Sequence, residues 1–259
     1  MSAQIQEDDN KLLKEREDSL SETEQQNQIK YSITQKFFSE LIGTLILLFV
    51  GTGIPVFTDN IVASCIGGGL ILTPLIYIFG KISGAHFNPA VSIPMFLLKK
   101  INLKELIFYF LAQLSGAFLA SIFVGLCRKG KFDKLAANKI GNFLLEIDNL
   151  SKPDAMCYFS AVFCEMTITF VLVLVVYSSG VIKNHFDNLT GIIVPITLST
   201  LLFTGVNVSG GSLNPVRSFA PAFLEAVSDN DTEPIKEVWI YFVGPIIGGI
   251  IGGFIGKLF

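Results

Sequence analysis

An asparagine-proline motif occurs twice in this sequence, and each copy lies between long apolar runs. The first copy is Asn88-Pro89-Ala90 and the second is Asn214-Pro215-Val216. Proline suits the first turn of a helix, because its missing N–H would have no intrahelical partner there. Each asparagine is therefore predicted to cap a helix with its side-chain oxygen and to offer its NH₂ group elsewhere. Two such caps indicate two short helices whose positive dipole ends point at a common site.

The apolar runs around the motifs predict a multi-pass membrane protein. Hydrophobic residues make up 51% of the 259 positions, which is too apolar for an ordinary soluble domain. Apolar windows of about 20 residues are long enough to cross a bilayer, whereas shorter ones enter only part of the way. The predicted spans are 36–57, 61–80, 105–127, 157–182, 189–208 and 238–258, and the predicted re-entrant half-helices are 88–98 and 214–227.

Matching positions in the two halves indicate an internal repeat. Glu40 precedes Asn88 by 48 positions, and Glu165 precedes Asn214 by 49. Because each half contains three spans, the halves must insert into the membrane in opposite senses. We therefore expect an all-α inverted repeat, with repeat one at about 36–127 and repeat two at about 157–258. It would form one membrane domain at 34–259.

Residues 1–33 differ in character from that domain. They are polar and rich in charged residues, and they lack the apolar core of a signal peptide. They are predicted to form a disordered tail in the cytoplasm.

The two motifs, with Arg217 after the second, resemble the major intrinsic proteins, which are the aquaporin and aquaglyceroporin channels. The resemblance covers about residues 36–258. The segments 84–91, 210–217 and Gly244-Pro245 look most similar to the plant nodulin-like subfamily, including the valine at position 216. The resemblance implies an aquaporin-like fold, homotetramers with one pore per subunit, and passive conduction of water and small uncharged solutes. Nodulin-like members conduct glycerol, urea, ammonia or uncharged metalloid hydroxides.

Arg217 is a permanent charge inside an apolar segment, which costs about 2.5–3.5 kcal/mol unless a pore or a partner solvates it. The resemblance places it in the family's outer constriction, the aromatic/arginine selectivity filter. Ungapped counting assigns Gly68, Leu202 and Gly211 to the same filter. Strict water channels usually place Phe where Gly68 stands and His where Leu202 stands, and bacterial glycerol channels follow the arginine with Asp instead of Ser218. We therefore expect a wide, apolar filter.

Glu40 and Glu165 lie within apolar spans, where an unpartnered carboxylate is costly. The resemblance implies a structural role, in which each carboxylate accepts hydrogen bonds from the backbone N–H groups of a re-entrant loop. A proton relay is the alternative.

The lysine distribution favours a cytoplasmic location for both termini. The lysines near the expected cytoplasmic ends are Lys81, Lys99, Lys100, Lys104, Lys183 and Lys257. The basic loop 128–153 opposes this orientation, because it would lie outside. We nevertheless keep the family's topology, with both termini in the cytoplasm, and we expect the protein in the plasma membrane. Asn149 and Asn230 would then be outside, in triplets that glycosylation could use.

Other classes of function find little support in the sequence. The net charge of −3 does not indicate nucleic acid, and no spacing predicts a metal site, a cofactor or a catalytic set. The four cysteines are expected to be buried free thiols, although Cys127 and Cys157 could pair. His86 is expected to pack, and His185 is a gating candidate. The alternatives are a secondary transporter, a strictly water-selective aquaporin, and a junction or adhesion protein with a closed pore.

Overall fold

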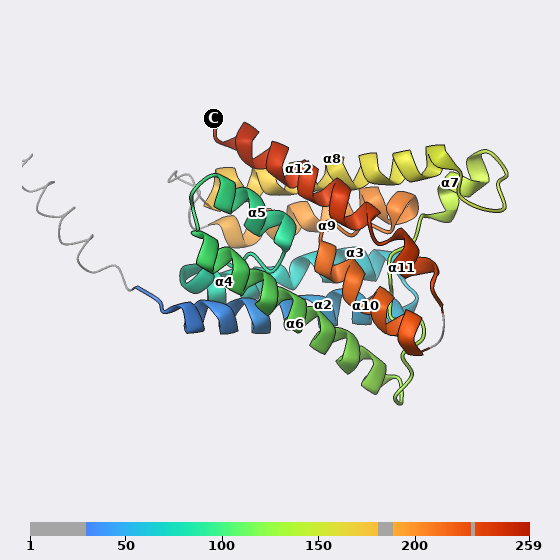
Figure 1. Ribbon diagram of the computed structural model, residues 1–259, viewed down its shortest axis with the longest axis horizontal. Helices are drawn as coiled ribbons and strands as arrows, with labels where there is room; N and C mark the ends of the chain where they lie inside the picture. The colour runs from blue at the N-terminus through green and yellow to red at the C-terminus, as the bar shows by residue number, and fades with distance from the viewer. Residues whose placement is uncertain (1–29, 181–188, 229–230) are drawn as a thin grey trace, which may run out of the picture. The chain divides into compact units, whose positions relative to one another are not determined.

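The computed structural model describes residues 30–180, 189–228 and 231–259, and residues 33–259 form one compact unit. Residues 30–32 are the described part of the unit that precedes it. Throughout the described residues the regular structure is helical, with no β-strand. The all-α fold class predicted from the sequence is therefore confirmed (Figure 1).

Within the described residues, six helical segments are long and apolar enough to cross a membrane. Their ends lie within a few residues of the predicted spans. The second span is broken at Ile71, where one helix ends and the next begins. The segments are α2 (Ile33–Thr58), α3 (Ile61–Leu70) with α4 (Leu72–Ser83), α6 (Leu103–Cys127), α8 (Ala155–Gly180), α9 (Thr190–Ser209), and α11 (Glu233–Glu237) with α12 (Ile240–Gly256).

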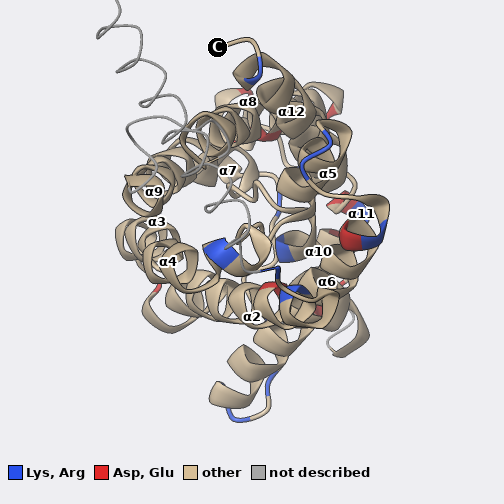
Figure 2. Ribbon diagram, turned by 90° about the vertical axis from the view of Figure 1, so that its left-hand side faces the viewer, with Lys and Arg blue, Asp and Glu red and all other residues tan. Residues whose placement is uncertain are grey.

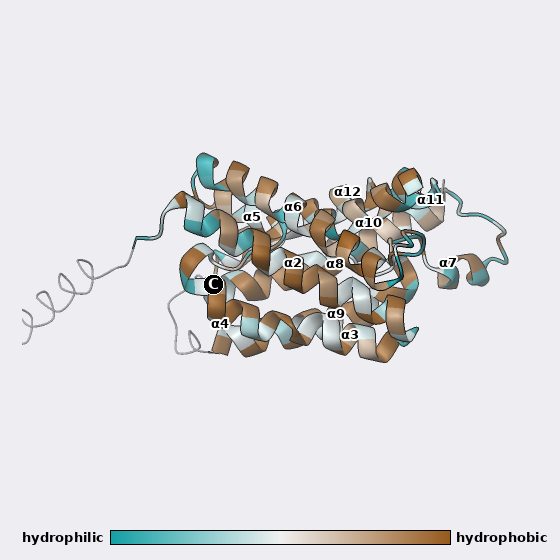
Figure 3. Ribbon diagram, turned by 90° about the horizontal axis from the view of Figure 1, so that it is seen from below, coloured by the Kyte–Doolittle hydropathy of each residue, from teal (hydrophilic) through white to brown (hydrophobic). Residues whose placement is uncertain are grey.

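Two short helices follow the asparagine-proline motifs, as predicted: α5 (Pro89–Leu97) and α10 (Pro215–Ser228). They approach the middle of the bundle from opposite ends (Figure 1). Viewed along the long axis, α5 and α10 lie on one side of the ring of helices, between α12 and α6 (Figure 2). Apolar residues follow the middle of the helices, and hydrophilic residues gather at the two ends (Figure 3). This is the distribution that a bilayer requires.

Glycines at matching positions bring helix pairs together in each half. A Cβ atom at Gly116 would lie 2.5 Å from the carbonyl oxygen of Leu41, and one at Gly248 would collide with the carbonyl oxygen of Met166. The pairs α2–α6 and α8–α12 therefore pack by the same close backbone approach. A Cβ atom at Gly249 would meet the carbonyl oxygen of Ala90. These contacts explain the C-terminal glycines by packing inside one subunit.

The loop between α6 and α8 differs from expectation, because it contains a short helix, α7 (Asn142–Ile147), that the sequence did not indicate. All four cysteines are free. Cys127 is exposed at the end of α6 and Cys164 is only half-buried, which corrects the expectation that all four are buried. Asn149 is also exposed. The predicted tail up to residue 29, Lys183, His185 and Asn230 lie outside the described residues.

Candidate functional site

Both motif asparagines cap their helices through the side-chain oxygen. Asn88 Oδ1 accepts a hydrogen bond of 2.8 Å from the N–H of Ala90, and Asn214 Oδ1 accepts one of 3.1 Å from the N–H of Val216. The prolines between them have no N–H to satisfy, so the cap bond goes to the second helical residue. Both asparagines are nearly buried, at 6% and 5% exposed. Two helix N-termini therefore face each other across the middle of the unit.

Each motif asparagine also donates a hydrogen bond to the loop that precedes the other motif. Asn88 Nδ2 donates to the carbonyl oxygen of Leu213 at 2.8 Å, and Asn214 Nδ2 donates to that of Phe87 at 3.0 Å. The two acceptor residues, Phe87 and Leu213, have φ angles of 51° and 55°, in the left-handed region. That backbone conformation costs about 1–3 kcal/mol for a residue other than glycine, so the surrounding hydrogen bonds must hold it. Each asparagine amide keeps a second N–H that can serve the space between the halves.

Glu40 holds the first loop. It is fully buried, and its two carboxylate oxygens accept four hydrogen bonds. Two come from backbone N–H groups, those of His86 at 2.9 Å and Phe87 at 2.7 Å. The other donors are the Ser83 hydroxyl at 2.6 Å and the Gln113 amide at 2.8 Å. This set of donors compensates for the burial of the carboxylate.

Glu165 occupies the matching place in the second half. Its oxygens accept from the N–H groups of Ser212 and Leu213, each at 2.8 Å, and from the Ser209 hydroxyl at 2.7 Å. Tyr241 adds a hydrogen bond of 2.9 Å to the carbonyl oxygen of Ser209. In the first half, Tyr109 bonds the carbonyl oxygen of Ser83 in the same way, at 2.6 Å.

Arg217 lies at the start of α10 and is held by the loop between α6 and α8. Its Nη1 donates to the carbonyl oxygen of Ala136 at 2.7 Å and to Asn138 Oδ1 at 2.6 Å. Asn138 Nδ2 in turn donates to the carbonyl oxygen of Gly210 at 2.9 Å. Sequence reasoning missed Asn138, because a single asparagine in a polar loop carries no sign of a partner 79 positions away.

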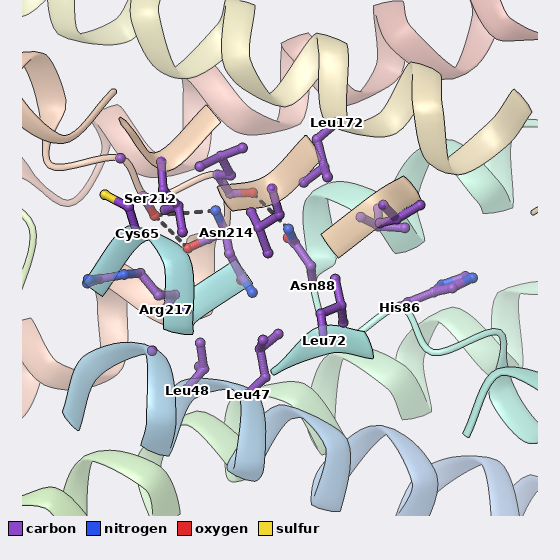
Figure 4. A pocket seen from close by; sticks show the side chains of 18 of the residues that line it. Leu47, Leu48, Cys65, Leu72, His86, Asn88, Leu172, Ser212, Asn214 and Arg217 are labelled. Atoms are coloured by element: carbon purple, nitrogen blue, oxygen red, sulfur yellow. Dashed lines mark hydrogen bonds between the residues drawn. The ribbon is translucent and has the colours of Figure 1, made fainter. Parts of the chain in front are cut away.

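A cavity of about 370 Å³ runs between these groups. Arg217 and Cys65 lie at one end, the two motif asparagines in the middle, and His86 at the other end (Figure 4). The ring of His86 contacts Ser92 Oγ at 3.1 Å, which gives it the packing contact expected of it.

The four residues assigned to the filter all line this cavity: Gly68, Leu202, Gly211 and Arg217. A Cβ atom at Gly68 would have Leu202 Cδ1 at 3.5 Å as its nearest neighbour, an ordinary contact distance. No Phe, Tyr or Trp side chain belongs to the described lining. The cavity also has many apolar lining residues, among them Leu47, Leu48, Leu72, Leu172, Val194 and Leu198.

Charge is sparse along the cavity. The described lining residues include Arg217 and Lys139 but no aspartate or glutamate. Lys139 donates to Asp231 at 2.9 Å, and this hydrogen bond holds the pKa of that carboxyl below its usual range. The described residues also contain no cluster of three side chains that could hold a metal ion. The arrangement can therefore orient neutral polar molecules through hydrogen bonds, with the guanidinium of Arg217 at one end.

Six spans and two half-helices that meet beside a partly polar cavity define a membrane channel. The family model described as "Major intrinsic protein" matches residues 27–256, and the chain belongs to that family of channels for water and small solutes.

Individual relatives agree with this assignment. A glycerol uptake facilitator protein-like 6 of Lactiplantibacillus plantarum is 32% identical, over 83% of this chain and 93% of its own. Nodulin-26 of Glycine max is 31% identical, over 88% of this chain and 79% of its own, which supports the nodulin-like features. The X-ray structure of the aquaglyceroporin from Plasmodium falciparum has a TM-score of 0.70 and 26% identity, and the match covers 88% of this chain and 97% of that one.

Proposed function

We propose that the cavity is the conducting pore and that it passes glycerol and urea together with water. The observation that carries this proposal is the composition of the lining near Arg217, where Gly68, Leu202 and Gly211 stand and no Phe, Tyr or Trp of the described residues narrows the cavity. A lining that combines apolar side chains with hydrogen-bonding groups also suits a molecule that carries both carbon and hydroxyls. The names of the bacterial facilitator and of the solved aquaglyceroporin point the same way.

Exclusion of ions and protons follows from the same residues. The N-termini of α5 and α10 place partial positive charge beside Asn88 and Asn214. Their amide N–H groups would turn a passing oxygen into an acceptor and interrupt a chain of hydrogen-bonded waters, as is argued for aquaporin-type channels in general. Arg217 adds a full positive charge near one end, which repels cations.

Stopped-flow measurements on proteoliposomes test the solute range. Vesicles that contain the purified protein should shrink faster than empty vesicles in a sucrose step, and should re-swell quickly when the osmolyte is glycerol or urea. Fast water flux without glycerol or urea flux would instead support the strictly water-selective alternative.

Flux should depend only on the gradient of the solute itself. A secondary transporter needs a coupling group in its path, usually a carboxylate. The described pore lining has none, because Glu40 and Glu165 are buried in loop hydrogen bonds. We expect sodium or proton gradients to leave glycerol flux into proteoliposomes unchanged. Accumulation of glycerol above its outside concentration would contradict a channel.

A thiol reagent provides a direct test of the pore. Among the four cysteines, Cys65 alone lines the cavity, one helical turn before Gly68. A mercurial attached there should block most water and solute flux. Cys65→Ser should conduct and resist the reagent, whereas Cys127→Ser, changed at an exposed position, should remain sensitive. A block that persists in Cys65→Ser would show that the reagent acts outside this cavity.

Assembly and orientation complete the proposal. The first span begins at the same end of the unit at which the chain ends (Figure 1). We propose that both termini face the cytoplasm in the plasma membrane, with residues 1–33 as a tail and 34–259 as the channel domain. Like the family, the chain should form homotetramers. Native mass spectrometry in mild detergent should give four times the 28.3 kDa subunit mass, and an active particle of monomer mass would contradict this.

A further inference from the structure

Glu225 is a buried carboxylate that the pore architecture described so far does not use. It lies on α10, two helical turns after Arg217, and is 3% exposed. Its Oε1 accepts hydrogen bonds from the backbone N–H groups of Leu135 at 2.5 Å and Ala137 at 3.4 Å. Both donors belong to the loop that holds the guanidinium. A carboxylate on one half-helix therefore binds the residues on either side of Ala136.

Ala136 is the link between the two charges. Its carbonyl oxygen accepts from Arg217 Nη1, while its neighbours donate to Glu225. Its φ angle is 59°, a left-handed conformation that is costly for alanine. The hydrogen bonds on both sides stabilise this turn, and the turn aims the carbonyl at the guanidinium.

The other end of the segment is anchored in a similar way. Glu237, which is 8% exposed, accepts from the N–H of Ile140 at 3.0 Å. Between the two anchors, Asn138 Oδ1 accepts from both Arg217 and Ser218. Carboxylates thus fix residues 135–140 at both ends, in the same manner in which Glu40 fixes the first pore loop.

This arrangement belongs to one half of the repeat. The position that matches Glu225 in the first half, at the same distance from the motif asparagine, is Lys99, two residues after the end of α5. Lys99 therefore cannot accept backbone N–H groups there. The inverted repeat by itself does not require a carboxylate at this place, so its role is specific to the end of the pore that contains Arg217.

We propose that Glu225 is a positioning residue for Arg217. It fixes residues 135–138, so that Ala136 and Asn138 hold the guanidinium against the wall and keep the pore open for solutes wider than water. This inference rests on the proposed function, because it takes Arg217 to lie beside the conducting path. Without the carboxylate, the buried N–H of Leu135 and the half-buried N–H of Ala137 lose their acceptor, and the loop shifts. The guanidinium then loses its two acceptors and turns toward the water in the cavity.

The test compares glycerol and water permeability in proteoliposomes, normalised to the amount of folded channel. Glu225→Ala should lower the ratio of glycerol to water permeability about tenfold, the shift expected when hydrogen bonds to a charged acceptor are lost. Glu225→Gln keeps one acceptor oxygen and should show a smaller change. Glu233→Ala, at an exposed carboxylate on α11, should leave the ratio unchanged.

A double-mutant cycle separates positioning from a general loss of stability. In an Arg217→Ala background, Glu225→Ala should change the ratio no further, because no guanidinium is left to position. An unchanged ratio in Glu225→Ala, or an equal drop in the Arg217→Ala background, would overturn the inference. If Glu225→Ala does not fold, Glu225→Gln is read by the same criteria.

Failure of the proposed function would look different. Wild-type protein would then conduct water but not glycerol. In that case the measured quantity is the ratio of proton permeability to water permeability, in place of the ratio of glycerol to water permeability. It should rise in Glu225→Ala and rise no further when that substitution is added to Arg217→Ala, and an unchanged leak would overturn the inference.

Discussion

Glycerol and urea flux should fall more than about tenfold when Gly68→Phe and Leu202→His are combined, which corresponds to at least about 1.4 kcal/mol of added barrier. Both side chains would project into the cavity beside Arg217, because Gly68 and Leu202 line it and a Cβ atom at Gly68 would be 3.5 Å from Leu202. Water is narrower and should lose much less flux. Stopped-flow permeability to water, glycerol and urea in the same vesicles measures the difference.

Leu70→Phe is the matched control for this double variant. Leu70 lies on the same helix, but its side chain is 46% exposed on the outer surface, and it is absent from the described pore lining. An added ring there should change neither flux. If the double variant conducts glycerol as well as wild type does, then another part of the pore sets the width.

Arg217→Ala should have a different effect, because it should loosen the exclusion of ions and protons.

Loss of either buried carboxylate should have the largest effect on folding. In Glu165→Ala, the N–H groups of Ser212 and Leu213 lose their acceptor, at about 1–3 kcal/mol for each unsatisfied buried group. Glu40→Ala removes the acceptor of four donors. Whole domains are stable by only about 5–15 kcal/mol, so the yield of folded protein should drop steeply. Glu40→Gln and Glu165→Gln keep one acceptor oxygen and should cost about 1–3 kcal/mol each.

Fluorescence-detected size exclusion and thermal melting in detergent measure these losses. Glu146→Ala is the control, since Glu146 is exposed on α7. Full yield and full flux in both alanine variants would refute the structural role. A change confined to the pH dependence of flux would favour the proton-relay alternative.

The sequence predicted those features of the fold that depend on local rules. Proline after asparagine located the start of each half-helix, and apolar length located the spans, because both signals lie within a few neighbouring residues. The break at Ile71 was not predicted, since an apolar window of 23 residues looks the same with or without it. The donors to Glu40 were predicted only in part, because Gln113 lies 73 positions away on another helix.

The surroundings of Arg217 show the limit more clearly. Arg217 was predicted as a site residue because it is a charge within an apolar segment. No comparable sequence feature distinguished Asn138 or Glu225. A polar side chain in a polar loop, or a glutamate near a helix end, is the ordinary expectation. Only the folded chain shows that Arg217 and Glu225 both bind the loop that contains Asn138.

The crossed hydrogen bonds of the motif asparagines also have a consequence in time. The acceptor of the Asn88 amide is Leu213, 125 positions later in the chain. At the usual rate of about 5–20 residues per second, the ribosome needs about 6 to 25 seconds to synthesise that interval. Throughout this interval the re-entrant loop of the first half lacks one of its hydrogen bonds, because the Asn88 amide lies within the membrane without its acceptor. We therefore expect membrane chaperones to bind the first half during this interval. Chains that stop before residue 213 keep an Asn88 amide without its acceptor, and this feature distinguishes them from complete chains.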